Sequence, residues 1–260
     1  MPIVTTPSGT AMHYEVSGAG EPVVLVHGIT ESGAAWGSIA DRLTVSRRVV
    51  VVDLPGHGHS GPAASYDVMA LAADVAAVIV AEGLDDVRLV GHSLGGVVVS
   101  APAAGEVPVR SVVNVDQSLK LDDFQAMLLA AEPALRDPES FPIVMEALLD
   151  GLAGDRLSDA ERERLRALRR VDQEVVLGVW MTVLETPTDE LAARVVELAS
   201  AIRCPYLSLH GTDPGPEYTA WLTRLVPTAT VETWAGLGHY PHLVDPDRFV
   251  RRLDEFWASD

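Results

Sequence analysis

The segment Val87-Arg-Leu-Val-Gly91-His92-Ser93-Leu94-Gly95-Gly96 is the most informative part of this sequence. Its first half is a short apolar run typical of a buried strand, and from Leu94 to Ala104 the pattern predicts a helix. Between the two lies Gly-x-Ser-x-Gly, whose small glycines allow a strand to turn sharply into a helix. A serine in such a turn presents its hydroxyl above the sheet, so Ser93 is a candidate nucleophile.

Apolar runs alternate with helical patterns on both sides of this segment. The runs are rich in valine and leucine and have the near-continuous hydrophobicity of strands that helices cover on both faces. This alternation predicts an α/β fold with a doubly wound, mostly parallel sheet. The expected strands are Pro22–Val26, Arg48–Val52, Val87–Val90, Val109–Val115, Pro205–Leu209 and Thr228–Trp234, and the expected helices are Ser32–Leu43, Asp67–Glu82 and Leu94–Ala104.

The alternation stops after the fourth expected strand. Residues 118–198 show several helical patterns and no convincing strand, and Ser158 with Glu161 forms a capping box that predicts a helix start. We expect this segment to be a helical cap inserted into a core built from residues 1–117 and 199–260. A length of 260 residues fits one such core with an excursion.

The charge of the chain disfavours several classes of partner. It has 37 acidic and 19 basic residues, for a formal net charge of -18. Such a chain repels phosphate backbones and anionic lipid surfaces, so we expect a small-molecule substrate and neither nucleic acid nor a membrane as partner. The stretch up to Tyr14 has no basic segment followed by an apolar run, and no uninterrupted apolar run reaches about eighteen residues. We therefore expect a soluble, cytoplasmic protein.

The sequence shows no motif that binds a metal or an organic cofactor. Cys204 is the only cysteine, so neither an intrachain disulfide nor a cysteine-based metal site can form. The sequence also has no cluster with metal-ligand spacing and no phosphate-binding glycine motif. We expect no metal and no organic cofactor.

The turn at Ser93 also predicts a donor for an oxyanion. The helix that follows begins with free backbone N–H groups and carries the positive end of its dipole. The amide of Leu94 is therefore placed to stabilise negative charge on a carbonyl oxygen that the serine attacks.

At this point the chain resembles the α/β-hydrolase family. The resemblance covers roughly residues 4–116 and 203–260, and the middle of the chain is similar only as a cap of the kind this family carries. It implies that Ile29, which follows His-Gly, supplies the second oxyanion N–H, and that His27 is structural. The segments that carry the resemblance are the Gly91–Gly95 turn, Leu25-Val26-His27-Gly28-Ile29 and Val52-Asp53-Leu54-Pro55-Gly56-His57-Gly58-His59-Ser60.

A serine hydroxyl needs a base with a pKa near 7 within hydrogen-bond reach. Of the eight histidines, His239 stands in Gly236-Leu-Gly238-His239-Tyr240, after the last expected strand. The α/β-hydrolase family places its catalytic histidine there, so we assign His239 as the general base. The other histidines receive structural or surface roles: His92 packs at the turn, His242 starts a helix, and His57 and His59 face solvent.

Two aspartates compete for the role of the acid that orients the base. The family commonly places it in a Gly-x-x-Asp loop, but here His210-Gly-Thr-Asp213-Pro-Gly215 brings Asp213 one residue early. A Pro-Gly turn at this loop resembles the haloalkane-dehalogenase and coelenterazine-luciferase branches, in which the acid ends the strand after the nucleophile helix. That position is Asp116, at the carboxyl edge of the sheet, where ligands bind in open α/β folds. We favour Asp116 and keep Asp213 as the alternative.

These residues predict a serine hydrolase that works through an acyl-enzyme. Ser93 attacks a carbonyl, His239 takes its proton, and the amides of Ile29 and Leu94 hold the oxyanion. The expected substrate is a carboxylic ester, lactone or thioester of a small to medium apolar molecule, because the cap is rich in apolar residues. The residues expected to line its pocket are Trp36, Phe124, Met127, Met145 and Trp180.

Other functions use the same residues. A C–C bond hydrolase or a biosynthetic lyase or cyclase would use the same triad, and perhydrolysis would use it with peroxide in place of water. A receptor for a small molecule would keep the fold without catalysis. Displacement of an alkyl halide is not expected, because Ser93 stands where the dehalogenases have an aspartate.

Overall fold

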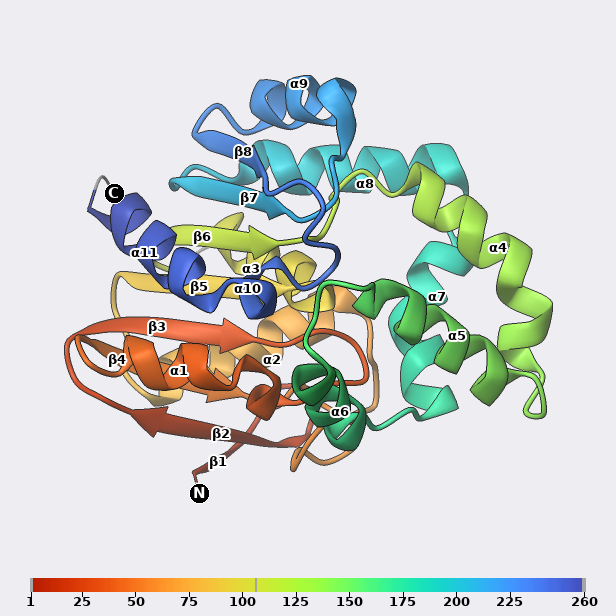
Figure 1. Cartoon of the computed structure of the whole chain (residues 1–260), viewed down its shortest axis with the longest axis horizontal. Helices are drawn as coiled ribbons and strands as arrows, with labels where there is room; N and C mark the ends of the chain where they lie inside the picture. The colour runs from red at the N-terminus through yellow and green to blue at the C-terminus, as the bar shows by residue number, and fades with distance from the viewer. Residues whose placement is uncertain (1, 106, 259–260) are drawn as a thin grey trace.

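The centre of this computed structural model, which describes residues 2–105 and 107–258, is an eight-stranded sheet (Figure 1). The strand order is β1-β2-β4-β3-β5-β6-β7-β8, in which β1 and β2 pair antiparallel and all later strands run parallel. The expected α/β class with a mostly parallel sheet is confirmed. The strands are β1 Ile3–Thr5, β2 Ala11–Ser17, β3 Glu21–Val26, β4 Arg47–Val52, β5 Val87–His92, β6 Val109–Val115, β7 Tyr206–His210 and β8 Ala229–Thr233.

The central strand β3 shows why the sheet has a core on each face. The side chains of Val23-Val-Leu-Val26 are fully buried, and successive side chains point to opposite faces. Val24 and Val26 therefore join one hydrophobic cluster, while Val23 and Leu25 join the other. Each such side chain contributes about 1.5–3 kcal/mol through burial, which is why the run is apolar without interruption.

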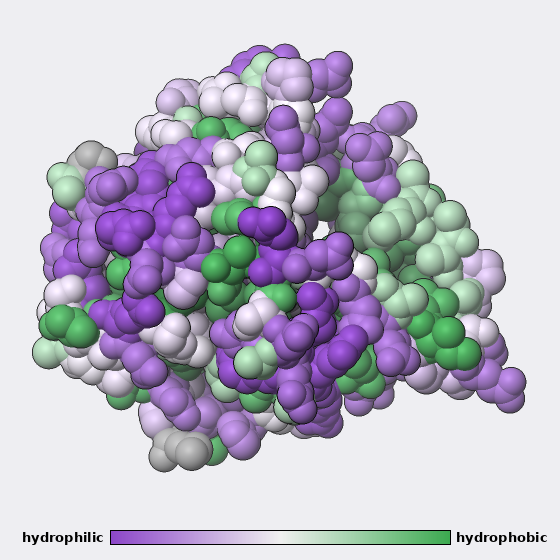
Figure 2. Space-filling view, viewed as in Figure 1, coloured by the Kyte–Doolittle hydropathy of each residue, from purple (hydrophilic) through white to green (hydrophobic). Residues whose placement is uncertain are grey.

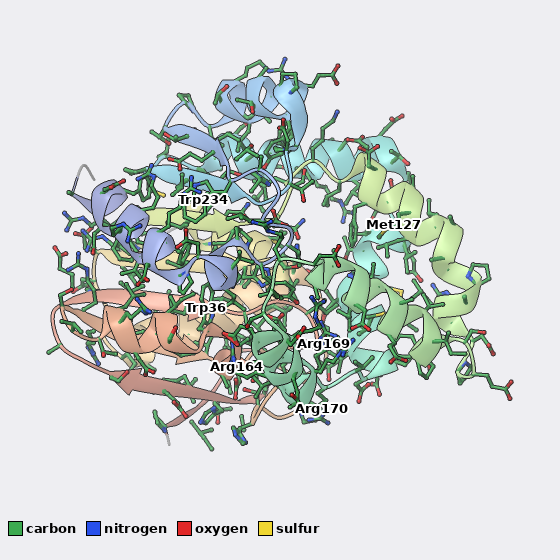
Figure 3. The ribbon with its side chains drawn as sticks, viewed as in Figure 1. Trp36, Met127, Arg164, Arg169, Arg170 and Trp234 are labelled. Carbon is green, nitrogen blue, oxygen red and sulfur yellow. The ribbon has the colours of Figure 1, made fainter. Side chains whose placement is uncertain are left out.

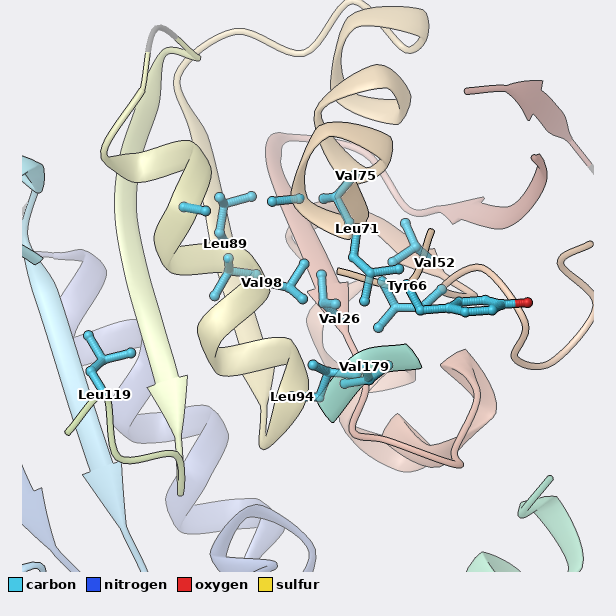
Figure 4. Close-up of a cluster of buried hydrophobic side chains, with 14 of the residues drawn as sticks. Val26, Val52, Tyr66, Leu71, Val75, Leu89, Leu94, Val98, Leu119 and Val179 are labelled. Atoms are coloured by element: carbon cyan, nitrogen blue, oxygen red, sulfur yellow. The ribbon is translucent and has the colours of Figure 1, made fainter. Parts of the chain in front are cut away.

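Helices cover both faces. Figure 1 shows α1, α10 and α11 in front of the sheet and α2 and α3 behind it. In the rear core, Leu94 and Val98 of α3 lie beside Val26, and Val179 from the distant α7 lies next to Leu94 (Figure 4). The bounds of these helices, together with those of α9, are α1 Ser38–Leu43, α2 Val68–Ala81, α3 Leu94–Ala103, α7 Gln173–Glu185, α9 Gly215–Leu225, α10 Pro241–Val244 and α11 Pro246–Trp257.

Several elements differ from the sequence analysis. The segments Ile3–Thr5 and Ala11–Ser17, to which no strand was assigned, are β1 and β2, and β2 pairs antiparallel with β4 at its outer edge. The expected helix Ser32–Leu43 is interrupted at Gly37, whose φ of 49° lies in the left-handed region. The chain therefore forms a short 3-10 helix, η1 (Gly33–Trp36), and then the separate helix α1.

Five consecutive helices connect β6 to β7. Four of them, α4 to α7, lie beyond the carboxyl ends of the strands, and α8 returns along the sheet (Figure 1). Ser158 caps α6, because its hydroxyl accepts a hydrogen bond from the backbone N–H of Glu161 at 3.2 Å. The division into a core and a cap at residues 118 and 198 stays a prediction. The remaining bounds are α4 Asp122–Arg136, α5 Phe141–Ala153, α6 Asp159–Leu168 and α8 Thr188–Ala201.

Parallel pairing aligns the carboxyl ends of the central strands. Val26 of β3 pairs with Gly91 of β5, and His92 of β5 pairs with Val115 of β6. Val115 in turn pairs with Leu209 of β7. The loops after these four strands therefore meet at one edge of the sheet, which is where open α/β sheets bind ligands.

Candidate active site

The turn between β5 and α3 holds Ser93 in a strained conformation. Its φ of 51° is unusual for a residue with a side chain, and its backbone N–H donates to the carbonyl of Val115 at 2.9 Å. Neither of the flanking glycines, Gly91 and Gly95, leaves room for a side chain. A Cβ on Gly91 would lie 2.1 Å from the carbonyl oxygen of Gly95, and a Cβ on Gly95 would lie 2.2 Å from that of Val26. The glycines therefore let β5, α3 and β3 approach closely enough to form the turn.

Asp116, directly after β6, contacts His239. Its Oδ2 lies 2.7 Å from His239 Nδ1, and its Oδ1 accepts a hydrogen bond from the backbone N–H of Gly211 at 2.7 Å. Burial alone would raise the pKa of the Asp116 carboxyl, but the hydrogen bonds and the neighbouring imidazole outweigh it and lower that pKa below its usual value. An ionised Asp116 accepts a hydrogen bond from the protonated Nδ1, which leaves Nε2 of His239 as the nitrogen that can take a proton from another group.

The β7 loop contributes a close backbone contact. A Cβ on Gly211 would lie 1.9 Å from the carbonyl oxygen of Gly238, so these two loops pack together at a position where only glycine fits. Gly211 thus touches the His239 loop on one side and binds Asp116 on the other. The sequence analysis missed this residue, although its position just after an apolar strand was visible.

Asp213 lies in a different environment from Asp116. It is exposed, and its Oδ1 accepts a hydrogen bond from the backbone N–H of Gly215 at 2.9 Å, as in a tight turn. Of the two candidate acids, the structure thus brings Asp116 to His239 and leaves Asp213 at the surface of its own loop.

The loop after β3 has a fixed peptide orientation. The carbonyl oxygen of Gly28 accepts hydrogen bonds from His27 Nδ1 at 2.7 Å and from the backbone N–H of Glu31 at 3.3 Å. Because a trans peptide is planar, the N–H of Ile29 points away from that carbonyl and its two donors. Nε2 of His27 accepts from the N–H of Leu54 at 3.0 Å, and this ties the loop to the end of β4. This geometry matches the structural role expected for His27.

The amide of Leu94 is the other backbone N–H that is expected to bind the oxyanion. Leu94 is the first residue of α3, and the first N–H groups of a helix have no partner within it. The roles of Ile29 and Leu94 as donors stay predictions.

The other histidines divide between core and surface. His57 is buried, contrary to the expectation that it faces solvent, because its turn folds against the sheet and its Nδ1 donates to the carbonyl of Pro55 at 2.9 Å. Burial lowers the pKa of His57 to about 4. His59 is exposed, as expected. His92 does more than pack, since its Nε2 donates to the backbone carbonyl of His239 at 2.9 Å.

A hollow separates the carboxyl edge of the sheet from helices α4 and α5 (Figure 2), and hydrophobic side chains dominate its helix side. Met127, whose exposed fraction is 43%, lies at the rim of this hollow (Figure 3). The rings of Phe124 and Trp180 meet edge to face with centroids 6.1 Å apart. Their contact with a substrate stays a prediction.

Two of the expected pocket residues lie in the core instead. Trp36 is 1% exposed, and its ring packs against His242 with centroids 5.2 Å apart. Met145 is 0% exposed and belongs to the hydrophobic cluster that also contains Val24 and Val26. Neighbouring side chains cover Trp36 and Met145 almost completely, so neither side chain is exposed in the hollow.

The described residues, 2–105 and 107–258, contain neither a candidate membrane-spanning helix nor a candidate metal-ligand cluster. Within these ranges, no helix is long and apolar enough to cross a membrane. The same ranges contain no group of three or more histidine, cysteine, aspartate or glutamate side chains arranged to hold a metal ion.

Known proteins with similar sequences include esterases and a C–C hydrolase. Pimeloyl-[acyl-carrier protein] methyl ester esterase of Vibrio cholerae is 30% identical, over 95% of this chain and 98% of the relative. The 2-hydroxy-6-oxo-2,4-heptadienoate hydrolase of Pseudomonas putida is 29% identical, over 94% of this chain and 91% of the relative. These relatives agree with the expected class of enzyme.

A solved esterase structure and a family sequence pattern also match this chain. An esterase from Rhodococcus sp. superposes with a TM-score of 0.74 at 28% identity, over 99% of this chain and 98% of that one. The pattern described as "Alpha/beta hydrolase family" matches residues 23–252, which include the turn at Ser93 and the loops of Ile29, Asp116 and His239. With most of its length matched and its sheet and serine turn in agreement, this chain belongs to the alpha/beta hydrolase family.

Proposed function

We propose that this chain is a serine hydrolase that cleaves a carboxylic ester, lactone or thioester of a small to medium apolar molecule. The proposal assigns Ser93 as nucleophile, His239 as general base and Asp116 as the acid that orients it. Ile29 and Leu94 supply the two amides that hold the oxyanion.

The reaction divides into two halves. Ser93 Oγ bonds to the carbonyl carbon while its proton passes to His239 Nε2, and the carbonyl oxygen becomes an oxyanion at the two amides. The tetrahedral intermediate then expels the alcohol or thiol, which takes the proton from His239. Water attacks the acyl-enzyme through the same base, and the carboxylic acid leaves as Ser93 recovers its proton.

The observation that carries this proposal is the 2.7 Å contact between His239 Nδ1 and Asp116 Oδ2, beside a serine with φ of 51°. The carboxylate fixes the tautomer in which Nε2 is free to accept a proton, and it stabilises the imidazolium that forms.

The substrate class rests on the surroundings of the hollow. Its helix side is hydrophobic, and Met127 gives it an adaptable apolar rim (Figures 2 and 3). The pimeloyl ester esterase relative supports an ester as the bond that is cleaved. The acidic net charge of the chain disfavours nucleic acid and anionic membrane surfaces as partners. We further propose a cytoplasmic location.

A C–C bond hydrolase is the second candidate. It is favoured by the 29% identity to the 2-hydroxy-6-oxo-2,4-heptadienoate hydrolase, which extends over nearly the whole of both chains. The two candidates share the nucleophile and base and differ in the leaving group, which is an oxygen or sulfur atom in one and a carbon atom in the other.

The test uses a fluorophosphonate probe together with two substrates. We expect the probe to label Ser93 in the parent protein, to leave Ser93→Ala unlabelled, and to label His239→Ala far more slowly. Ser65→Ala, which changes an exposed serine, is the matched control and should label like the parent. Equal labelling of the parent and Ser93→Ala would overturn the proposal.

The second measurement compares kcat/KM for a p-nitrophenyl ester of medium chain length with that for a 2-hydroxy-6-oxo-dienoate. A higher value for the ester supports the first candidate, and a higher value for the dienoate supports the second.

A further inference from the structure

Behind the candidate active site lies a buried carboxylate that the mechanism above does not use. Glu31 is 3% exposed and sits just past the Ile29 loop. Its Oε2 accepts a hydrogen bond from the backbone N–H of Gly28 at 3.1 Å, and its Oε1 accepts from the hydroxyl of Tyr240 at 2.7 Å. His92 Nδ1 lies 3.5 Å from the same Oε2. A buried carboxylate is expensive unless it is hydrogen-bonded, and this one accepts from Gly28 in its own loop and from Tyr240 in the His239 loop, with His92 of the Ser93 turn beside it.

Each of these partners is the sequence neighbour of a group that the proposed mechanism requires. Gly28 precedes Ile29, the expected oxyanion donor. The other two partners are His92, which precedes Ser93, and Tyr240, which follows His239.

The contacts also control orientation. The carbonyl oxygen of His239 can only accept, so His92 Nε2 carries a proton and donates a hydrogen bond to that carbonyl, while the other side of the ring lies against Glu31, with Nδ1 3.5 Å from Oε2. The main chain of Glu31 donates to the carbonyl of Gly28 while its side chain accepts from the N–H of the same residue. Glu31 therefore holds both sides of Gly28, and this sets the direction of the next N–H, that of Ile29.

We propose that Glu31 is a positioning residue, whose carboxylate holds the Ile29 loop, the Ser93 turn and the His239 loop in one arrangement. This inference rests on the proposed function and adds to it the group that aligns the oxyanion donor with the base. It touches neither substrate nor reacting atoms. Its effect should appear in the transition state, where the oxyanion and the imidazolium form, and not in binding of the ground state.

The central variant is Glu31→Gln, which keeps the size of the side chain. An amide has one oxygen and one NH2 group, so it cannot accept from both Gly28 and Tyr240 with separate oxygens. We expect kcat for a neutral p-nitrophenyl ester to fall roughly 10- to 100-fold, less than the loss of a whole oxyanion donor. KM should stay within about threefold, because the binding surface is unchanged.

Tyr240→Phe is the second variant, and it removes only the hydroxyl that donates to Glu31. We expect a smaller fall in kcat with KM unchanged. If Glu31 acts through Tyr240, the double variant should lose less than the product of the two single losses. This variant keeps the inference testable if Glu31→Gln does not fold.

The matched control is Asp74→Asn, which changes another fully buried carboxylate with two donors, the backbone N–H and the hydroxyl of Ser8. It tests whether loss of any buried carboxylate lowers kcat. We expect it to lower thermal stability and to leave kcat within about twofold of the parent.

The outcomes separate the two proposals. If the parent fails to label with the fluorophosphonate, the proposed function is wrong. If the parent labels and turns over ester while folded Glu31→Gln and Tyr240→Phe keep parental kcat, the function stands and the positioning role of Glu31 is wrong. An equal fall in kcat for Asp74→Asn and Glu31→Gln would also contradict that role.

Discussion

The loops that follow β6 and β7 end at the same edge of the sheet, and each carries an aspartate. Asp116 in the first is buried against His239, whereas Asp213 in the second is exposed and accepts a hydrogen bond within its own turn. The β7 loop instead supplies Gly211, whose N–H binds Asp116 and whose lack of a side chain admits the His239 loop. Position at the edge is thus insufficient to make a carboxylate part of a site. The packing of the neighbouring loop decides which aspartate reaches the histidine.

The largest effect is expected from Asp116→Asn. Asparagine tolerates the left-handed backbone of this position, where φ is 55°, so the fold should survive. The amide cannot serve as the anionic partner of His239, and loss of tautomer control lowers kcat by about 10⁴ in a comparable triad. We expect a fall in kcat of about 10³- to 10⁴-fold on an activated ester, measured beside circular dichroism to check folding. A folded variant with kcat within tenfold of the parent would show that Asp116 is not the acid.

Gly211→Ala should have the next largest effect. The added methyl group would meet the backbone oxygen of Gly238 at 1.9 Å, so the His239 loop or the β7 loop must move. A displacement of about 1 Å in a catalytic group can cost on the order of 100-fold in rate, and we expect a loss of that size in kcat/KM.

Gly215→Ala is the matched control for that change. It is a glycine at the next turn of the same loop, where a Cβ meets nothing within 4 Å but the φ of 82° adds strain. It should lower stability while it leaves kcat/KM within a few fold. Parental activity in Gly211→Ala would mean that the close contact does not set the position of His239.

The carboxylate of Asp116 should also make the stability of the fold depend on pH. The pKa of Asp116 is lowered in the folded protein, so its carboxylate contributes stability that is present above the unfolded value of about 3.9 and is lost as pH falls through the folded value. The difference in unfolding free energy between the parent and Asp116→Asn should therefore shrink as pH is lowered from 6 to 3. Urea denaturation at several pH values measures it, and a difference that stays constant would contradict the lowered pKa.

How far the sequence predicts this site depends on how local each signal is. Ser93 was predicted because its turn is encoded in five adjacent residues, of which Gly91 and Gly95 are needed for close approach. The choice between Asp116 and Asp213 stayed open because both follow apolar strands. They are separated by the contact between Asp116 and His239, which depends on the packing of Gly211 against Gly238. Sequence patterns carry no record of that contact.

The sequence analysis missed or misplaced other residues for a similar physical reason. Glu31 went unnoticed because two of its partners, His92 and Tyr240, come from loops that are far from it in the sequence. Trp36 was expected at the pocket because it follows the Ile29 loop, but the break at Gly37 turns the chain so that the indole packs on His242. In both cases tertiary packing, and not local propensity, decides the environment of the side chain.

The smallest effect is expected from Asp213→Asn. The amide oxygen still accepts the hydrogen bond from Gly215, and the side chain is exposed, so the unfolding free energy should change by less than about 0.5 kcal/mol. Because Asp213 does not contact His239, kcat/KM should stay within about twofold of the parent, measured with the same ester. Asp213→Ala, which also removes the acceptor, is the companion variant, and it should lower stability by about 0.5–1 kcal/mol without loss of kcat. A fall in kcat of a hundredfold or more in Asp213→Asn would reverse the comparison, because it would place the acid on the β7 loop during catalysis despite the contact that Asp116 makes with His239.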